Sequence, residues 1–323
     1  MACLGLSYYG EIMKRVLITG GTGFVGASLA RRMLADGHEV HLIIRAAGTA
    51  WRIKTIREDV RLHENNLSDN KSLARLIATI RPDWVFHLAV YGAYSDQNDL
   101  RLMLRTNVTG TANLVDVCVE RGFEAFVNAG SSSEYGFKNS PPSEEDRIDP
   151  NSQYAVTKSF ATQYCAFAAR KHNMKVVTLR LYSVYGPYED KRRFIPTLIS
   201  HAIKGRLPPL VAPETARDFV YVDDICEAFV LAATKSVSGR GLVYNIGSGI
   251  QTTIRQAVDI AIDMFGIKED PLWNTMPGRQ WDTDKWVADS HLARTCLNWH
   301  PQYSFRDGFQ KTMEWTMAHP GLI

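Results

Sequence analysis

The sequence has little of what marks disulfide-stabilised, membrane-spanning or nucleic-acid-binding proteins. Its 323 residues contain only five cysteines, which are scattered and include no C-x-x-C pair. We therefore expect reduced thiols in a cytoplasmic protein, with neither a disulfide framework nor a metal site. No apolar run approaches the roughly 20 residues that a helix needs to span a bilayer. The net charge is only +3, which gives no reason to expect nucleic acid or an anionic membrane as a partner.

Internal repeats and low-complexity segments are also missing, and the remaining composition is that of an ordinary globular protein. The sequence is 45% hydrophobic and 22% charged, and its 323 residues can bury a large core. Residues 1–13 lack the basic start and the apolar core of a signal peptide. We interpret them as an extension that takes no part in catalysis.

Strand-like and helical patterns alternate through the first half of the chain. We expect strands at 15–19, 39–44, 83–88, 125–129 and 175–180, and helices at 24–35, 100–121 and 152–172. This alternation predicts an α/β fold with a parallel, doubly wound sheet of the Rossmann type, which binds ligands at the carboxyl ends of its strands. After about residue 182 proline and glycine cluster and the strands become short.

A glycine-rich turn follows the first predicted strand. The segment reads Val16-Leu-Ile-Thr-Gly-Gly-Thr-Gly-Phe-Val-Gly26. Its glycine spacing allows a tight turn and brings the backbone close to a pyrophosphate at the N-terminus of the next helix. The motif predicts a dinucleotide cofactor that is held by Gly20, Gly23, Phe24, Val25 and Gly26.

A tyrosine and a lysine stand four residues apart in Tyr154-Ala-Val-Thr-Lys158. Residues at this spacing share one face of a helix, so the phenol of Tyr154 lies beside the ammonium of Lys158. A neighbouring positive charge favours the tyrosinate form, and such a phenol can act as an acid or base near neutral pH.

Together these two motifs resemble the extended short-chain dehydrogenase/reductase family, whose members modify nucleotide sugars with NAD or NADP. The resemblance runs from about residue 14 to residue 315. It implies a Rossmann-type domain over 14–181 that holds the cofactor and the catalytic residues. It also implies a smaller, interleaved substrate-binding part over 182–323, and a homodimer in which helices 100–121 and 152–172 pair into a four-helix interface.

The end of the second strand predicts the choice of cofactor. In this family an acidic residue at that point binds the adenine ribose of NAD, but here the position is Ile44 and Arg45 follows it. A guanidinium favours a 2′-phosphate, so we expect NADP(H) over NAD(H). The alternative is a solvated arginine with the choice of cofactor made elsewhere. The resemblance also assigns cofactor contacts to Asn66, Leu67, Leu88, Ala89, Asn107, Tyr154, Lys158, Tyr182 and Val184, and we expect His87 to be a packed structural histidine.

The segment Asn128-Ala-Gly-Ser-Ser-Ser-Glu-Tyr-Gly136 resembles the family's catalytic Ser/Thr segment. Aligned on its first serine, Ser132 takes the catalytic position and would donate a hydrogen bond to the reacting sugar oxygen; Ser131 and Ser133 are competing candidates. The resemblance implies that Tyr154 exchanges the proton at that oxygen and that Lys158 holds the cofactor ribose. Glu134 is interpreted either as a base, as in the nucleotide-sugar dehydratases, or as a carboxylate that orients the loop.

Ala216-Arg-Asp-Phe-Val-Tyr-Val-Asp-Asp224 resembles the family's Arg-Asp-Phe-x-Tyr-Val-x-Asp motif. The resemblance implies that Arg217 clamps the substrate diphosphate and that Arg279 is a second cation. A salt bridge from Arg217 to Asp218 or Asp223 is the alternative. The expected substrate site is completed by Ser132, Ser133 and Phe194.

These features predict an enzyme that acts on nucleotide sugars. The leading interpretation is NADPH-dependent reduction of a nucleotide 4-keto-6-deoxyhexose, because a net reduction draws on the NADPH pool of the cell. The alternative is a 4,6-dehydratase or 4-epimerase that recycles its NAD(P). A cofactor-binding regulator without catalysis is a remote alternative, because such proteins typically lose the tyrosine or lysine that this chain keeps.

Overall fold

The computed structural model describes residues 13–45, 50–94, 96–236, 239–276, 283 and 285–321. Nearly all of the predicted extension over 1–13 lies outside the described residues. In the described part, no helix is both long and apolar enough to cross a membrane. Three of the described cysteines, Cys118, Cys165 and Cys226, are buried free thiols, and Cys296 is an exposed one.

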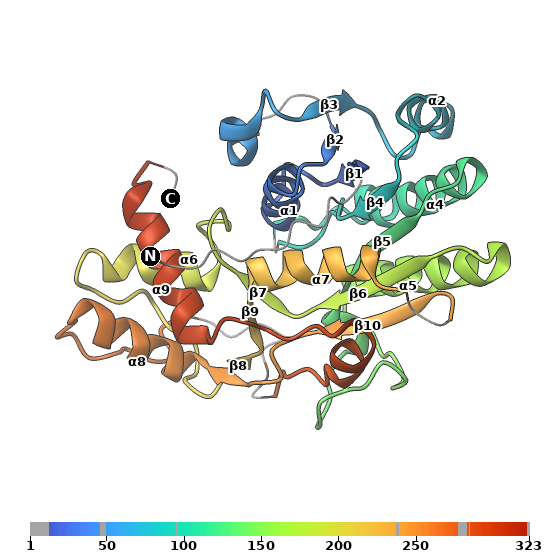
Figure 1. The fold of residues 1–323 in the computed structure, drawn as a ribbon. Helices are drawn as coiled ribbons and strands as arrows, with labels where there is room; N and C mark the ends of the chain where they lie inside the picture. The colour runs from blue at the N-terminus through green and yellow to red at the C-terminus, as the bar shows by residue number, and fades with distance from the viewer. Residues whose placement is uncertain are drawn as a thin grey trace, which may run out of the picture.

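A seven-stranded parallel sheet forms the centre of the molecule (Figure 1). Its order is β10-β6-β5-β4-β1-β2-β3, which confirms the predicted doubly wound sheet. The strands before β4 are added on one side of β1, and β4 and the later strands are added on its other side. Ligands of such folds bind at the carboxyl ends of the strands near this change of side. The strands are β1 (Arg15–Thr19), β2 (Glu39–Ile44), β3 (Arg61–Glu64), β4 (Trp84–His87), β5 (Ala125–Ser131), β6 (Val176–Leu181) and β10 (Leu242–Ile246).

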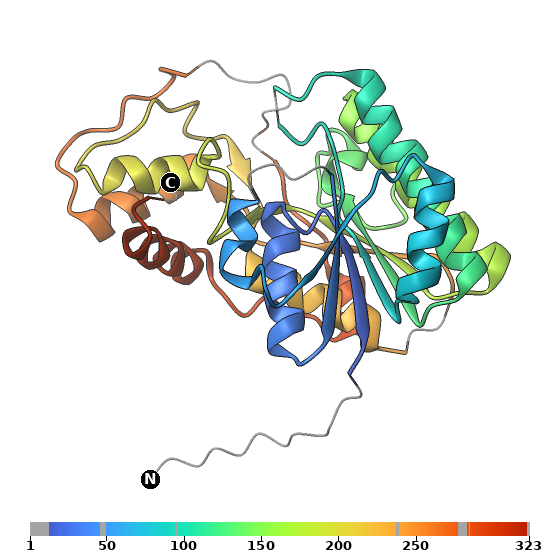
Figure 2. The ribbon, with the colours of Figure 1, turned by 90° about the horizontal axis from the view of Figure 1, so that it is seen from above.

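Helices cover both faces of this sheet (Figure 2). One face carries α1 (Phe24–Ala35) and α7 (Val222–Thr234), and the other carries α2 (Asn70–Ile80), α4 (Gly110–Arg121) and α5 (Gln153–His172). Successive strand residues point to opposite faces. In β1, Val16 and Ile18 accordingly join the core on the α1 side, whereas Leu17 joins the core beneath α2 and α4.

Residues after 182 build a smaller part beside the sheet (Figure 1). Two short strand pairs link it together, β7 (Ser183–Tyr185) with β9 (Phe219–Tyr221), and β8 (Ala216–Arg217) with β11 (Thr252–Thr253). Because β10 returns to the main sheet beside β6, the chain crosses between the two parts more than once. The helices of this part are α6 (Phe194–Ala202), α8 (Ile254–Phe265), η4 (Ala293–Leu297) and α9 (Phe305–Ala318).

The helix predicted over 100–121 differs in one respect from the observed segment. It consists of α3 (Leu100–Met103), the π-helical turn η2 (Leu104–Thr109) and α4. A π-helical turn makes room for one extra residue and is frequent at functional sites. Here it contains Asn107, a predicted cofactor residue. Two 3₁₀ segments complete the fold, η1 (Trp51–Ile56) and η3 (Ser132–Tyr135).

Candidate active site

The glycine-rich turn between β1 and α1 forms a cradle that only glycine allows. Gly20 has φ 71°, and a Cβ there would lie 2.6 Å from the carbonyl carbon of Leu88. A Cβ on Gly26 would lie 2.3 Å from the oxygen of Gly20. Helix α1 starts at Phe24 after Gly23, which has no side chain to cap it. Its first N–H groups can therefore receive an anion, and the cradle fits the pyrophosphate of a dinucleotide.

His87 anchors this cradle from the adjacent strand. Its Nδ1 lies 2.7 Å from the Thr19 hydroxyl and its Nε2 lies 2.9 Å from the Thr111 hydroxyl. Thr111 itself donates to the carbonyl of Asn107 and Thr19 accepts from the N–H of Ala89. These roles require a neutral imidazole with its proton on Nε2. Burial lowers the pKa of His87 to about 3, so this residue is packed and structural, as expected.

Asn107 fixes the backbone that follows β4. Its amide oxygen accepts from the N–H of Tyr91 at 2.9 Å, and its amide nitrogen donates to the Tyr91 carbonyl at 2.8 Å. The same nitrogen donates to the Thr157 hydroxyl on α5 at 2.9 Å. Asn107 thus ties the segment after β4 to the helix that carries Tyr154 and Lys158. We assign it an ordering role.

Tyr154 and Lys158 lie at the start of α5, whose N-terminus is capped by Ser152. Tyr154 is half-buried, and Lys158 is only 5% exposed. The Lys158 ammonium donates to the carbonyl of Ala129 in β5, which places it at the carboxyl end of the sheet. Burial raises the pKa of the Tyr154 phenol, whereas a hydrogen bond with Ser131 and the charge of Arg193 lower it. Burial lowers the pKa of Lys158, and the carboxylate of Glu134 opposes that shift.

Ser131 is the serine of this segment that acts on the pKa of Tyr154. Ser131 lowers the pKa of the Tyr154 phenol through its side chain, and its hydroxyl lies 2.7 Å from that of Ser133. Ser132 begins the turn η3 and lines a separate cavity. We therefore favour Ser131, one of the competing candidates, over Ser132 as the serine that works with Tyr154.

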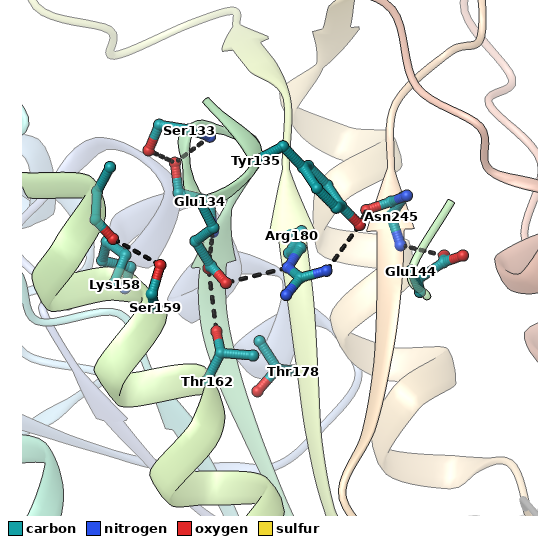
Figure 3. Close-up of polar contacts among 12 residues, drawn as sticks. Ser133, Glu134, Tyr135, Glu144, Lys158, Ser159, Thr162, Thr178, Arg180 and Asn245 are labelled. Atoms are coloured by element: carbon teal, nitrogen blue, oxygen red, sulfur yellow. Dashed lines mark hydrogen bonds and ion pairs between the residues drawn. The ribbon is translucent and has the colours of Figure 1, made fainter. Parts of the chain in front are cut away.

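Glu134 is not placed to act as a base on a substrate. Its side chain is 0% exposed, and its carboxylate accepts hydrogen bonds from the Ser131 N–H, the Thr162 hydroxyl and the Arg180 guanidinium at 2.8, 3.0 and 3.0 Å (Figure 3). Burial raises its pKa, and the charge of Arg180 opposes that shift. The interpretation of Glu134 as a base is thereby corrected in favour of a carboxylate that orients the loop.

The remaining predicted cofactor residues surround the same edge of the sheet. Arg45 is exposed at the end of β2, and Asn66 is exposed after β3. Leu67 is buried against Gly110 of α4, and Leu88 and Ala89 border Gly20. Tyr182 is buried and Val184 lies in β7. Within the described residues the hydroxyl of Tyr182 has no hydrogen-bond partner.

A cavity of about 270 Å³ lies beside the catalytic turn. Ser132, Tyr182, Gln251, Trp286 and Lys285 are among the residues that line it. It lies between the main sheet and the part that follows residue 182. A sugar ring with hydroxyl groups would find both polar and aromatic side chains there.

The predicted diphosphate contacts are only partly described. The Arg217 guanidinium donates to the Ala216 carbonyl at 2.6 Å and lies 5.9 Å from the ring centre of Trp286, so it is near the cavity. Asp218 is fully buried and accepts from Ser248, Gly249 and Ala288. Phe194 is the first residue of α6. Arg279 lies outside the described residues.

Two arginines near the site were not predicted. Arg180 is 3% exposed in β6 and binds Glu134, and Arg193, just before α6, acts on the pKa of Tyr154. A charged residue inside the apolar strand Val-Val-Thr-Leu-Arg-Leu was a signal for Arg180, since a buried charge needs a partner. Arg193 stands in a polar loop, where the sequence gives no such signal.

Known proteins share both the sequence and the fold. Residues 16–247 match the model of the NAD dependent epimerase/dehydratase family. The chain is 29% identical over 310 residues to the UDP-glucose 4-epimerase of Mycolicibacterium smegmatis, with 93% of this chain and 97% of the relative covered. It is 25% identical to the dTDP-glucose 4,6-dehydratase of Streptomyces griseus, with 94% of each covered. The structure of UDP-glucose 4-epimerase with UDP-glucose from Thermotoga maritima superposes with a TM-score of 0.85 at 26% identity, covering 94% of this chain and 99% of that one.

Proposed function

Because this chain belongs to the NAD-dependent epimerase/dehydratase family of extended short-chain dehydrogenase/reductase enzymes, we propose that it oxidises and re-reduces a ring hydroxyl of a nucleotide sugar. The observation that carries this proposal is the meeting of Tyr154, Lys158 and Ser131 at the carboxyl end of β5. The glycine cradle after β1 lies at the same edge of the sheet.

The residues of the glycine-rich turn and Lys158 are suited to bind a nicotinamide dinucleotide. Gly20, Gly23 and Gly26 leave room for a pyrophosphate at the N-terminus of α1, and the Lys158 ammonium would donate to a ribose hydroxyl of the cofactor. When bound, NAD(P) supplies the hydride acceptor and, after reduction, the hydride donor. Tyr154 takes the proton of the sugar hydroxyl during oxidation and returns a proton during reduction. Ser131 donates a hydrogen bond to the same sugar oxygen.

Of the possible outcomes, a recycling 4-epimerisation has the best support. The relatives include UDP-glucose 4-epimerases in both sequence and structure. A 4,6-dehydratase needs a carboxylate that removes a carbon-bound proton, and the buried position of Glu134 argues against that role here. The net reduction of a 4-keto-6-deoxy sugar, which the sequence favoured, is our second candidate.

The second candidate rests on Arg45. It is exposed at the carboxyl end of β2, where a guanidinium can attract a 2′-phosphate. A preference for NADP(H) would favour net reduction, because NADPH is the usual cellular reductant for such steps. The preference for NADP(H) over NAD(H) is thus part of this proposal.

A single incubation separates the two candidates. The purified protein is mixed with NADPH or NADH and a panel of nucleotide hexoses and 4-keto-6-deoxyhexoses, while absorbance follows the reduced cofactor and chromatography follows the sugars. Isomerisation of a hexose without net consumption of cofactor supports the epimerase. Stoichiometric oxidation of NADPH with a keto sugar supports the reductase. Absence of both reactions across the panel would contradict the proposed function.

We also propose that the protein forms a homodimer through α5 and the helical segment over 100–121. Large apolar side chains are exposed there, namely Leu100, Leu104, Val156, Phe160 and Phe167. Exposed apolar side chains gathered on neighbouring helices are typical of an interface. A nucleotide sugar is the proposed small-molecule partner, and the cytoplasmic location suggested by the cysteines stays a prediction.

A further inference from the structure

A buried ion pair lies directly behind the catalytic turn. Glu134 is 0% exposed and Arg180 is 3% exposed, and the guanidinium Nε lies 3.0 Å from Oε2 of the carboxylate. In the part of the chain that the structure describes, every other ion pair between a carboxylate and an arginine or lysine has at least one side chain that is 36% or more exposed. Figure 3 shows the pair between η3 and β6.

The Glu134 carboxylate of this pair is hydrogen-bonded to the backbone of Ser131, the serine that we place in the active site. Its Oε1 accepts from the N–H of Ser131, while the Ser131 hydroxyl accepts from the N–H of Ser133, which forms a capping box around η3. The same Oε1 accepts from the Thr162 hydroxyl on α5, the helix that carries Tyr154. One carboxylate oxygen therefore joins the loop of Ser131 to the helix of Tyr154.

The guanidinium is itself held from the opposite side. Its Nη1 donates to the Tyr135 hydroxyl at 2.7 Å, and that hydroxyl donates to the amide oxygen of Asn245 at 2.8 Å (Figure 3). The guanidinium carbon also lies 4.5 Å from the centre of the Tyr135 ring. Arg180 is thus held in one orientation on β6, between β5 and β10, and its Nε donates to the Glu134 carboxylate.

The close approach of the carboxylate depends on a glycine. A Cβ on Gly130 would lie 3.0 Å from Oε1 of Glu134 and 2.7 Å from a methyl carbon of Thr178. A residue with a side chain here would push the carboxylate away from Ser131. The last residues of β5 are therefore shaped around the ion pair.

We propose that the Glu134–Arg180 pair positions Ser131 against Tyr154 for proton transfer, and that both are positioning residues. A buried ion pair contributes little net stability compared with apolar side chains of the same volume. A role in orientation better explains its place, because its carboxylate binds both the backbone of Ser131 and the Thr162 hydroxyl on the helix that carries Tyr154. The inference rests on the proposed function for its catalytic meaning, but its effect on Tyr154 can be measured without substrate.

The decisive variant is Glu134→Gln. The amide keeps the shape of the side chain, yet it cannot accept from Ser131, Thr162 and Arg180 together, because one of its oxygens is replaced by a donor. The phenol of Tyr154 is titrated by tyrosinate absorbance, as the difference between each protein and the same protein carrying Tyr154→Phe. The negative charge of Glu134 raises the pKa of Tyr154, so loss of that charge alone would lower it. We expect the pKa to rise in Glu134→Gln instead, because Ser131 no longer favours tyrosinate once its loop is released. A fall would show that only charge couples Glu134 to Tyr154 and would overturn the positioning role.

Kinetics supply the second readout. We expect kcat to fall about 10- to 100-fold in Glu134→Gln, with KM and cofactor Kd within about twofold of wild type, because misplacement of reacting groups lowers the chemical step more than binding. A wild-type protein that is inert on every nucleotide sugar would contradict the proposed function, and the titration would still test the positioning role.

Two further variants guard against a purely structural effect. Asp224→Asn alters another buried carboxylate, which accepts from the N–H groups of Gln302 and Tyr303 far along the chain, and it should leave the Tyr154 titration unchanged. If Glu134→Gln does not fold, the apolar pair Glu134→Val with Arg180→Met replaces it. A folded Glu134 variant with wild-type kcat and an unshifted Tyr154 titration would overturn the proposal, and so would an equal shift in Asp224→Asn.

Discussion

At the scale of single residues, the chemistry depends on which serine faces Tyr154. Ser131 lowers the pKa of the phenol, whereas Ser132 lines the neighbouring cavity. We expect Ser131→Ala to lower kcat about 100-fold, since a donor to the reacting oxygen is lost. Ser132→Ala should lower it less than about tenfold. Steady-state kinetics of the two variants, side by side, make the comparison, and the reverse order would reinstate Ser132.

Tyr154 itself is the residue whose loss should cost most. We expect Tyr154→Phe to lower kcat by about 10²- to 10⁴-fold, because the group that carries the proton is removed. Cofactor affinity should stay within about twofold, since the phenyl ring keeps its place on α5. Turnover and cofactor titration measure the two effects. Turnover within threefold of wild type would contradict the assignment.

Arg45 tests the choice of cofactor. We expect Arg45→Ala to weaken NADP(H) binding about tenfold while NAD(H) binding changes less than about twofold, because only NADP(H) carries a 2′-phosphate for the guanidinium. Fluorescence titration of the reduced cofactors gives both dissociation constants. Equal losses for the two cofactors would remove Arg45 as the selector.

The residues that could be predicted from sequence are those whose role depends on local geometry. The spacing of Gly20, Gly23 and Gly26 constrains one turn, and the spacing of Tyr154 and Lys158 constrains one helix face. The roles of Ser131 and Glu134 depend instead on where the chain turns after β5 and on Arg180 from a distant strand. The Ser131-x-x-Glu134 spacing is a local capping-box pattern, whereas the pairing of Glu134 with Arg180 is tertiary information that no pattern near position 134 contains.

At the scale of elements, His87 joins β4 to β1 and α4 through two threonine hydroxyls. Its pKa is lowered to about 3 in the folded protein, against about 6.5 in an unfolded chain. Between these values the unfolded state binds more protons, so the free energy of unfolding falls as the pH drops below about 6.5.

This linkage gives a measurable difference between wild type and His87→Gln. From pH 7 to pH 5 we expect the free energy of unfolding of the wild type to decrease by about 2 kcal/mol more than that of the variant. Glutamine can keep the two hydrogen bonds but cannot be protonated in this range. Urea denaturation at the two pH values gives the comparison, and parallel decreases would show that His87 does not titrate on unfolding.

The strands and helices predicted by range in the first half of the chain are present in the structure, and the helix over 100–121 shows one informative difference. Apolar strands and the doubly wound order follow from alternation along the chain, and the structure confirms them. The predicted helix over 100–121 contains the π-helical turn η2. The pattern of apolar residues along a helix does not reveal a turn that contains one extra residue. In this turn Asn107 forms hydrogen bonds with Tyr91 and Thr157.

At the scale of the whole molecule, the exposed apolar residues of α5 argue for a second subunit. Phe160 and Phe167 stand on the same helix with Tyr164 between them, and the ring centres of Phe160 and Tyr164 lie 5.6 Å apart. We expect light scattering at micromolar concentration to give the mass of a dimer. Phe160→Glu with Phe167→Glu should give a monomer, because burying two carboxylates would oppose association. A wild-type monomer would contradict the proposal.

The returning strand β10 has a consequence for anyone who wishes to redesign this protein. It runs beside β6 in the main sheet, and its Asn245 is bound to Tyr135 behind the catalytic turn, although it belongs to the part of the chain that follows residue 182. The part of the chain after residue 182 therefore cannot be exchanged without also changing a strand that supports the catalytic turn. Grafting everything after β6 from a relative would import a foreign strand into the catalytic framework, so successful recombination requires breakpoints on both sides of β10.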